Sequence, residues 1–263
     1  MTAPPSSALL AEAPAGRHLA QFHRNPASLV DSAFEFLEAG LRRGQSVLVI
    51  VERDHLDQLL DRLTASKLHS KALTNSGQLG MMDAGKMVDE FLADGLPEWT
   101  RFRASIGPVL ARITPYGRGT RVYSDMAGVL WRTGRTDAAI RIEELWNKLA
   151  DNYQFSLYCG FLMDTQSEEA YDAPLEELGR THSDILSTLD DEQFGVALDR
   201  ASKEIFGVSL TQMAGATRDG VRRFPSGQRT MLWVTRNLPM STAQLAEKAR
   251  QYFRDTDGVR PQP

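Results

Sequence analysis

Residues 44–52 read GQSVLVIVE, and the run VLVIV at 47–51 decides the expected fold. This run is continuously apolar and rich in β-branched residues, which is typical of a strand buried on both faces of a parallel sheet. Further strand candidates follow the same pattern at 18–22, 79–83, 121–124 and 155–161. Segments with helical periodicity separate these strands, and parallel neighbours need a crossover that a helix fills. The sequence therefore predicts an α/β domain with a mostly parallel sheet and helices on both faces.

Length and composition are those of a folded protein. The chain has 263 residues, of which 42% are hydrophobic and 24% charged, so a medium domain and a small one fit the length. Its single cysteine excludes an internal disulfide. No apolar run approaches the length of about 18 residues that a membrane span needs, and the first residues do not resemble a signal peptide. We therefore expect a soluble, cytoplasmic protein without a membrane partner.

Four segments differ in composition and charge. We predict a disordered leader over 1–16, an α/β domain over 17–163, an acidic helical connector over 164–190 and a small helical domain over 191–263. The last 68 residues, 196–263, hold 11 Lys and Arg against 6 Asp and Glu, a net charge of +5, which leaves 19 against 28, a net charge of −9, for the rest. A basic tail favours a polyanionic partner, although arginines also simply solvate helix faces.

The carboxyl ends of the predicted strands are where a parallel sheet binds ligands. The candidate ligand-binding residues there are His23, Arg24, Asn25, Glu52, Asp125 and Cys159. Arg24 and the start of a helix at Pro26 could hold an anionic group, whereas Asn25 could instead be a plain helix cap. Acids that end a strand, such as Asp83 and Asp125, commonly cap the next helix.

No catalytic pattern is recognisable. The segment FHRNPASL at 22–29 follows the first strand but has neither glycine nor Lys-Ser/Thr, so it cannot form an ordinary phosphate-binding loop. The chain also lacks Gly-x-Ser-x-Gly and His-Glu-x-x-His. His18 and His23 could ligate a metal with Cys159, but no close His/Cys spacing supports it. We therefore expect a protein that is not an enzyme and has neither cofactor nor metal, with an atypical nucleotide hydrolase as an alternative.

Five spaced pieces of the N-terminal part carry a family resemblance. They are HLAQFH, GLRRGQSVLVIVE, FLADGLPEW, RVYSDMAGVLW and GRTDAAIRIEELWNKL, followed by a Cys-Gly-Phe strand end. Over residues 17–163 this combination resembles the MEDS sensory domain of methanogen, methylotroph and dichloromethane-regulator proteins. The resemblance implies a RecA/KaiC-like fold without its phosphate loop, serving as a sensor of small molecules in bacterial signalling and transcription regulators.

The C-terminal part carries a second resemblance. The pieces IFGVSLTQM and QRTMLWVTRNLPMSTAQLAEKARQYFRDTDGV, with a basic loop between them, resemble the DNA-binding helix-turn-helix domain of the replication initiator DnaA over 194–259. The resemblance implies that the DNA-contacting residues are Arg222, Arg223 and Arg229 in the basic loop, and Arg254 and Thr256 at the start of the recognition helix. Gly258 and Pro261 shorten that helix relative to the family.

These observations lead to two hypotheses of different class. The first is a one-component regulator whose N-terminal domain senses a small ligand or a regulatory protein and whose C-terminal helices bind DNA. The alternative is a signalling adaptor whose C-terminal helices dock a protein instead. A homodimer is compatible with both hypotheses.

Overall fold

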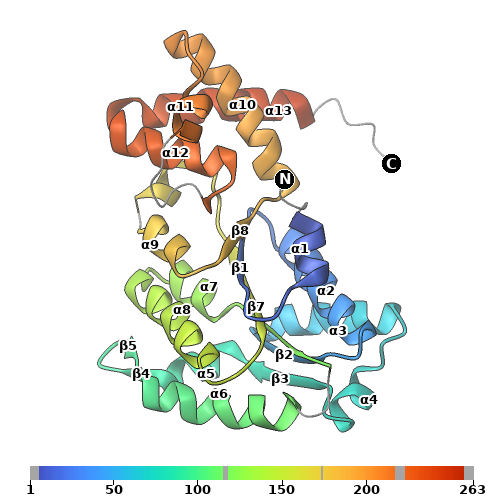
Figure 1. Ribbon diagram of the computed structural model, residues 1–263. Coiled ribbons are helices and arrows are strands. Elements are labelled where there is room, and N and C mark those ends of the chain that lie inside the picture. The colour runs from blue at the N-terminus through green and yellow to red at the C-terminus, as the bar shows by residue number, and fades with distance from the viewer. Residues whose placement is uncertain (1–5, 115–117, 173, 217–222, 258–263) are drawn as a thin grey trace. The chain divides into compact units, whose positions relative to one another are not determined.

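The computed structural model, shown in Figure 1, forms two compact units. Unit 1 comprises Met1–Leu162 and Thr181–Ser183, and unit 2 comprises Met163–Arg180 and Asp184–Pro263. The structure describes residues 6–114, 118–172, 174–216 and 223–257, with side chains as far as 254 in the last range. Residues 164–180 thus group with the C-terminal helices, although we had expected a separate connector over 164–190.

A parallel sheet forms the centre of unit 1. Its strands are β1 (His18–His23), β2 (Ser46–Val51), β3 (Leu79–Asp83), β6 (Thr120–Ser124) and β7 (Ser156–Leu162). Within unit 1 these strands have the order β3-β2-β6-β7-β1, and every pairing in this order is parallel. All five residues of the VLVIV run are buried, as expected for a central strand. The predicted α/β class with a parallel sheet is confirmed.

Helices cover both faces of this sheet. They are α1 (Ser6–Glu12), α2 (Pro26–Arg42), α3 (Arg53–Ala65), α4 (Ser70–Asn75), α5 (Ala84–Phe91), α6 (Trp99–Ile113), α7 (Met126–Arg132) and α8 (Thr136–Ala150). Helix α2 lies against β1, β2, β6 and β7 and also contacts α1 and α3, whereas α5 to α8 contact one another. A two-stranded hairpin of β4 (Leu92–Ala93) and β5 (Leu96–Pro97) follows α5.

The entry to α2 follows from local chemistry. The Asn25 side chain accepts a hydrogen bond from the Ser28 backbone N–H at 2.8 Å, and Pro26 occupies the first turn, where no donor is needed. The expected helix cap is therefore present. The same contact removes the Asn25 carboxamide oxygen from the set of groups available to a ligand.

The expectation of a disordered leader over 1–16 is wrong for residues 6–12, which form α1 with Leu10 buried. The cause is Arg121, a fully buried arginine on β6. Its guanidinium donates to the carbonyls of Leu10, Ala11 and Glu12 at 2.8–3.1 Å. A helix C-terminus presents free carbonyls and a negative dipole end, both of which suit a buried cation. Composition alone could not reveal this partner.

Unit 2 is mostly helical. Its elements are η2 (Glu168–Tyr171), α9 (Leu175–Arg180), β8 (Asp184–Leu186), α10 (Leu189–Phe206), α11 (Leu210–Ala216), α12 (Ser226–Asn237), η4 (Pro239–Ser241) and α13 (Thr242–Asp257). Helix α10 begins with a capping box of Thr188 and Asp191 and ends before Gly207. The expectation of a helical connector over 164–190 is wrong at Ile185, because this residue belongs to strand β8.

Helix α12 corrects the expected basic loop around Pro225 and Gly227. The helix starts at Ser226, so Arg229 lies in a helix. Gly227 is needed for close packing, since a Cβ on it would come within 3.2 Å of the Gly195 nitrogen on α10. The glycine thus marks a helix crossing and not a loop. Within the described part of the chain, none of the helices has the length and apolar composition that a bilayer crossing requires.

Candidate functional site

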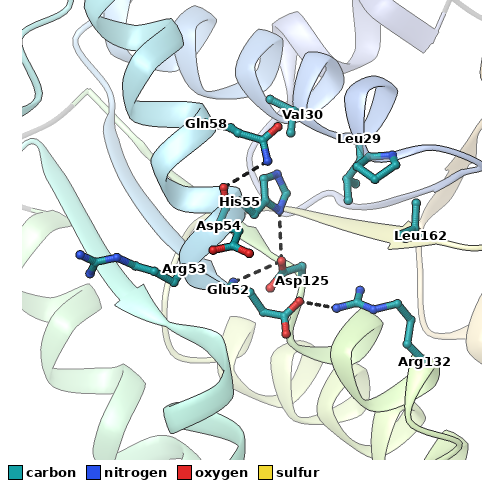
Figure 2. A pocket seen from close by; sticks show the side chains of 11 residues that line it. Leu29, Val30, Glu52, Arg53, Asp54, His55, Gln58, Asp125, Arg132 and Leu162 are labelled. Atoms are coloured by element: carbon teal, nitrogen blue, oxygen red, sulfur yellow. Dashed lines mark hydrogen bonds and ion pairs between the residues drawn. The ribbon is translucent and has the colours of Figure 1, made fainter.

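A cavity of about 530 Å³ opens in unit 1 beyond the carboxyl ends of β2 and β6. Its volume lies within the range of about 300–1,000 Å³ that small-molecule sites occupy. Figure 2 shows the side chains around it. They are Pro26, Leu29, Val30, Glu52, Arg53, Asp54, His55, Gln58, Asp125, Arg132 and Leu162. The polar groups come mainly from the residues that follow β2 and β6, and the apolar wall comes from α2 and the end of β7.

A histidine–aspartate pair forms the buried part of this cavity. His55 Nδ1 lies 3.1 Å from Asp125 Oδ2, and the two side chains point toward one another in Figure 2. The Glu52 backbone N–H also reaches Asp125 Oδ2, at 3.4 Å. Both residues are buried, yet His55 Nε2 and Asp125 Oδ1 have no hydrogen-bond partner among the described residues. Buried polar atoms are normally satisfied, so an unpaired donor or acceptor in a cavity points to a ligand or water.

Asp125 is not used as a helix cap. It occupies the N-cap position of α7 but makes no side-chain capping bond there. Asp83, at the corresponding end of β3, does cap its helix by accepting from the Lys86 backbone N–H at 3.0 Å. The expectation that such acids cap the next helix therefore holds for Asp83 and fails for Asp125, whose carboxylate is turned toward His55.

A second ion pair lines the cavity at a more exposed position. Glu52 and Arg132 pair through Oε2 and Nη2, with side chains 48% and 31% exposed. Leu29, Val30 and Leu162 provide the opposing apolar surface. The cavity thus combines an accessible charged part, a buried polar pair and a hydrocarbon wall, which is the usual composition of a site for a small organic molecule.

Residues 17–183, more than half of the chain, match the family model described as MEDS, the MEthanogen/methylotroph, DcmR Sensory domain. The chain belongs to the MEDS family. Membership implies a sensory or signalling role, and the match extends 20 residues beyond the end that we had expected at 163. Comparisons with curated proteins and with solved structures gave no match. The C-terminal helices have no family assignment, so the resemblance to DnaA has no support from these comparisons.

The MEDS domain brings only part of the predicted ligand set together. Glu52 and Asp125 line the cavity. Arg24 and Asn25 are exposed and do not line it, and Asn25 caps α2. His23 is buried among Ser28 and Tyr158, whose hydroxyl groups lie 3.1 Å from its Nδ1 and Nε2. Burial, reinforced by His55, lowers the pKa of His23 to about 3, so the imidazole is neutral near pH 7.

Cys159 also lies away from the cavity. Its side chain contacts α8, where Sγ is 3.2 Å from Glu143 Oε2. Burial, together with the Glu143 carboxylate, raises the pKa of the Cys159 thiol well above its usual value. An unmodified thiol in this position is therefore protonated and not a reactive thiolate.

Sequence reasoning missed His55 and Arg132. His55 lies three residues after Glu52, in the first turn of α3, so the order Glu-Arg-Asp-His after a predicted strand was the available signal. Arg132 is the last residue of α7, the helix that begins directly after Asp125. Only the packing of α3 and α7 around the sheet edge places these two side chains beside the predicted acids.

The structure differs from the predicted placement of the DNA-contacting residues, three in a basic loop and two at the start of a recognition helix. Arg222 lies outside the described residues, as does the Thr256 side chain. Arg223 precedes α12 and Arg229 lies within it. Arg254 lies near the end of α13, not at the start of a new helix, and its Nη2 is 3.6 Å from Glu247 Oε1.

Proposed function

We propose that this MEDS protein is a sensor whose small ligand binds in the cavity beside His55 and Asp125. His55 and Asp125 both line the cavity, and the observation that carries the proposal is that two of their buried atoms are unsatisfied. His55 Nε2 and Asp125 Oδ1 have no hydrogen-bond partner among the described residues. Leaving such atoms unpaired costs about 1–3 kcal/mol each, and a bound ligand recovers that cost.

The chemistry of the lining selects the class of ligand. Three acids line the cavity with two arginines, Arg53 and Arg132, and Glu52 is already paired with Arg132. The buried acid is Asp125, so the inner part of the cavity favours a hydrogen-bond donor over an anion. Leu29, Val30 and Leu162 favour a hydrocarbon part. We therefore propose a compact, partly apolar molecule that carries a hydroxyl or amino group, donating to Asp125 and bonding to His55. The anionic ligand considered for Arg24 does not suit these acids.

We propose that binding is not followed by turnover. A His–Asp pair resembles two parts of a nucleophilic triad, but none of the described residues lining the cavity is serine, threonine or cysteine. The β1–α2 connection at 23–25 also has no glycine with which to cradle a phosphate. These features support a receptor and give no support to a hydrolase.

The experiment is a calorimetric screen of the full chain against small alcohols and amines, followed by variants. Asp125→Asn and His55→Gln should weaken the binding of a hit by tenfold or more, because each removes a partner of the ligand. Asp83→Asn is the matched control, since it changes an acid at the end of the neighbouring strand outside this cavity. Equal affinity in all three variants would refute the site.

We further propose that the C-terminal helices transmit the signal by binding DNA. The net charge of +5 over 196–263 supports a polyanionic partner. Mobility shifts with the full chain should weaken steeply with salt and with Arg222→Ala/Arg223→Ala, because phosphate contacts release counterions. Arg236→Ala is the control, since Arg236 is ion-paired with Glu176. Absent or salt-insensitive binding would favour the adaptor with a protein partner.

A further inference from the structure

Four buried side chains with metal-binding donors converge on the α8 side of unit 1, away from the sensory cavity. They are His18 on β1, Glu143 on α8, Cys159 on β7 and His182 in the segment 181–183. Their exposed fractions are 5%, 1%, 1% and 1%. One donor atom from each lies within 4.8 Å of the others. These residues are up to 164 positions apart in sequence, and all four fall inside the MEDS match.

The fold holds each of the four donors in place. Strands β1 and β7 are parallel neighbours in which Cys159 pairs with Ala20, so the Cys159 and His18 side chains lie on the same face. The segment that carries His182 is bound to β1, because the Ser183 backbone N–H donates to the His18 carbonyl at 2.7 Å. Such fixed backbone positions are what a preorganised metal site requires.

Four of the six distances between donor atoms are close to those of a tetrahedral site, and the other two are within 4.8 Å. Zinc binds nitrogen and oxygen at about 2.0–2.1 Å and thiolate sulfur at about 2.3 Å, so adjacent ligands of a tetrahedron lie roughly 3.3–3.6 Å apart. Glu143 Oε2 lies 3.0 Å from His18 Nε2, 3.2 Å from Cys159 Sγ and 3.7 Å from His182 Nε2. His18 Nε2 lies 3.5 Å from Cys159 Sγ. Small adjustments would seat an ion among all four atoms.

Neighbouring residues orient the imidazole of His18. The Asn147 amide nitrogen donates to the Thr181 carbonyl at 2.7 Å, which turns its Oδ1 toward His18 Nδ1 at 2.9 Å. With Nδ1 facing the Asn147 oxygen, the other ring nitrogen, Nε2, is the one that faces the Glu143 carboxylate, at 3.0 Å.

We propose that His18, Glu143, Cys159 and His182 bind a divalent transition-metal ion, with zinc preferred. Imidazole and thiolate ligands select such metals over magnesium or calcium. Cys159 releases its thiol proton to solvent when the ion binds, and the resulting thiolate and the Glu143 carboxylate neutralise the charge of the ion, which suits a site away from water. Four protein ligands leave no open coordination position, so the ion links β1, β7, α8 and the 181–183 segment and has a structural role. Asn147 does not touch the ion but orients the imidazole of His18 through its contact with Nδ1.

The direct test uses the full chain, unfolded with a chelator and refolded with and without metal. We expect elemental analysis to find zinc at one equivalent per refolded chain. Co²⁺ should give the near-ultraviolet charge-transfer band of a thiolate ligand and the visible bands of a tetrahedral ion. If the folded chain takes up no zinc and its Co²⁺ spectrum lacks a thiolate band, the proposal is overturned.

Variants separate ligation from a general effect on folding. Cys159→Ser should abolish the charge-transfer band, and His182→Gln should weaken Co²⁺ binding by more than tenfold. Asn147→Ala should weaken it by about 10- to 100-fold while the band remains, because Asn147 acts through His18. His69→Gln, which changes an exposed histidine outside the cluster, is the matched control and should bind as the wild type. Should Cys159→Ser fail to fold, the Co²⁺ spectra of Asn147→Ala and the wild type still show whether a thiolate binds the ion. Uptake unchanged by His182→Gln would contradict the assigned ligand set.

Discussion

The MEDS domain contains two groups of buried histidines and carboxylates, and they differ in access. The pair of His55 and Asp125 lines an open cavity and retains polar atoms without partners among the described residues. The four-residue cluster around Glu143 is closed and directs all its donors at one point. An open pair can exchange a ligand, whereas a closed cluster can only hold an ion or a proton. The same side-chain types therefore suit ligand exchange at the His55–Asp125 pair and a structural role in the cluster around Glu143.

The largest expected effect is on the closed cluster. Glu143→Ala should lower the free energy of unfolding of the metal-free chain by about 3–5 kcal/mol, because it leaves buried polar partners without their carboxylate. Urea unfolding measures the change. The control is Glu144→Ala, since Glu144 forms a half-exposed pair with Arg141 and should change stability by under about 1 kcal/mol. Equal changes in the free energy of unfolding for Glu143→Ala and Glu144→Ala would contradict a special role for the buried cluster.

A fourth buried histidine, His23, tests the effect of burial without a carboxylate partner. Because burial lowers the pKa of His23 to about 3, the unfolded chain takes up a proton below its ordinary pKa of 6.5 that the folded chain does not. Stability from this group is present above pH 6.5 and should be lost at roughly 1.4 kcal/mol per pH unit as the pH falls toward 3.

The measurement is urea unfolding at several pH values for the wild type and His23→Gln. The pH slope should be smaller in His23→Gln, whereas His69→Gln should retain the wild-type slope. Parallel slopes in wild type and His23→Gln would show that His23 is charged in the folded state.

The open pair should respond in binding and not in stability. Asp125→Asn should reduce affinity for a hydroxyl or amino ligand by about ten- to a hundredfold, the equivalent of one charge-assisted hydrogen bond. Its free energy of unfolding should change by less than about 1 kcal/mol, because the Asp125 carboxylate is only partly satisfied in the folded protein. Calorimetry and urea unfolding measure the two quantities. A large stability loss with unchanged affinity would make Asp125 structural.

The smallest effect is expected for the exposed pair that lines the cavity. Glu52→Gln should alter stability by under about 1 kcal/mol, since solvent screens its pair with Arg132. The association rate of a cationic amine should fall, and more at low salt than at high salt. Stopped-flow binding at two ionic strengths checks this. A salt-independent rate in the wild type would remove Glu52 from the entry route.

Much of the fold was predictable because its signals are local. The β-branched run at 47–51, the Asn25-Pro26 helix start and Gly207 at the end of α10 each act through neighbouring residues. Helix α1 was missed because its partner is distant in sequence: Arg121 on β6 donates to the carbonyls at the end of α1. Strand β8 was missed because it is three residues long, too short to show a periodicity.

The sequence by itself determined the α/β class, the absence of a glycine-rich phosphate loop between β1 and α2 and the acids that follow β2 and β6, because periodicity and residue order are properties of the chain. Only the tertiary structure decided which residues meet. It joined His55 to Asp125 and gathered His18, Glu143, Cys159 and His182, because side chains far apart in sequence come together only when strands and helices pack. The spacing of residues along the chain does not indicate which distant residues lie close together in the folded protein.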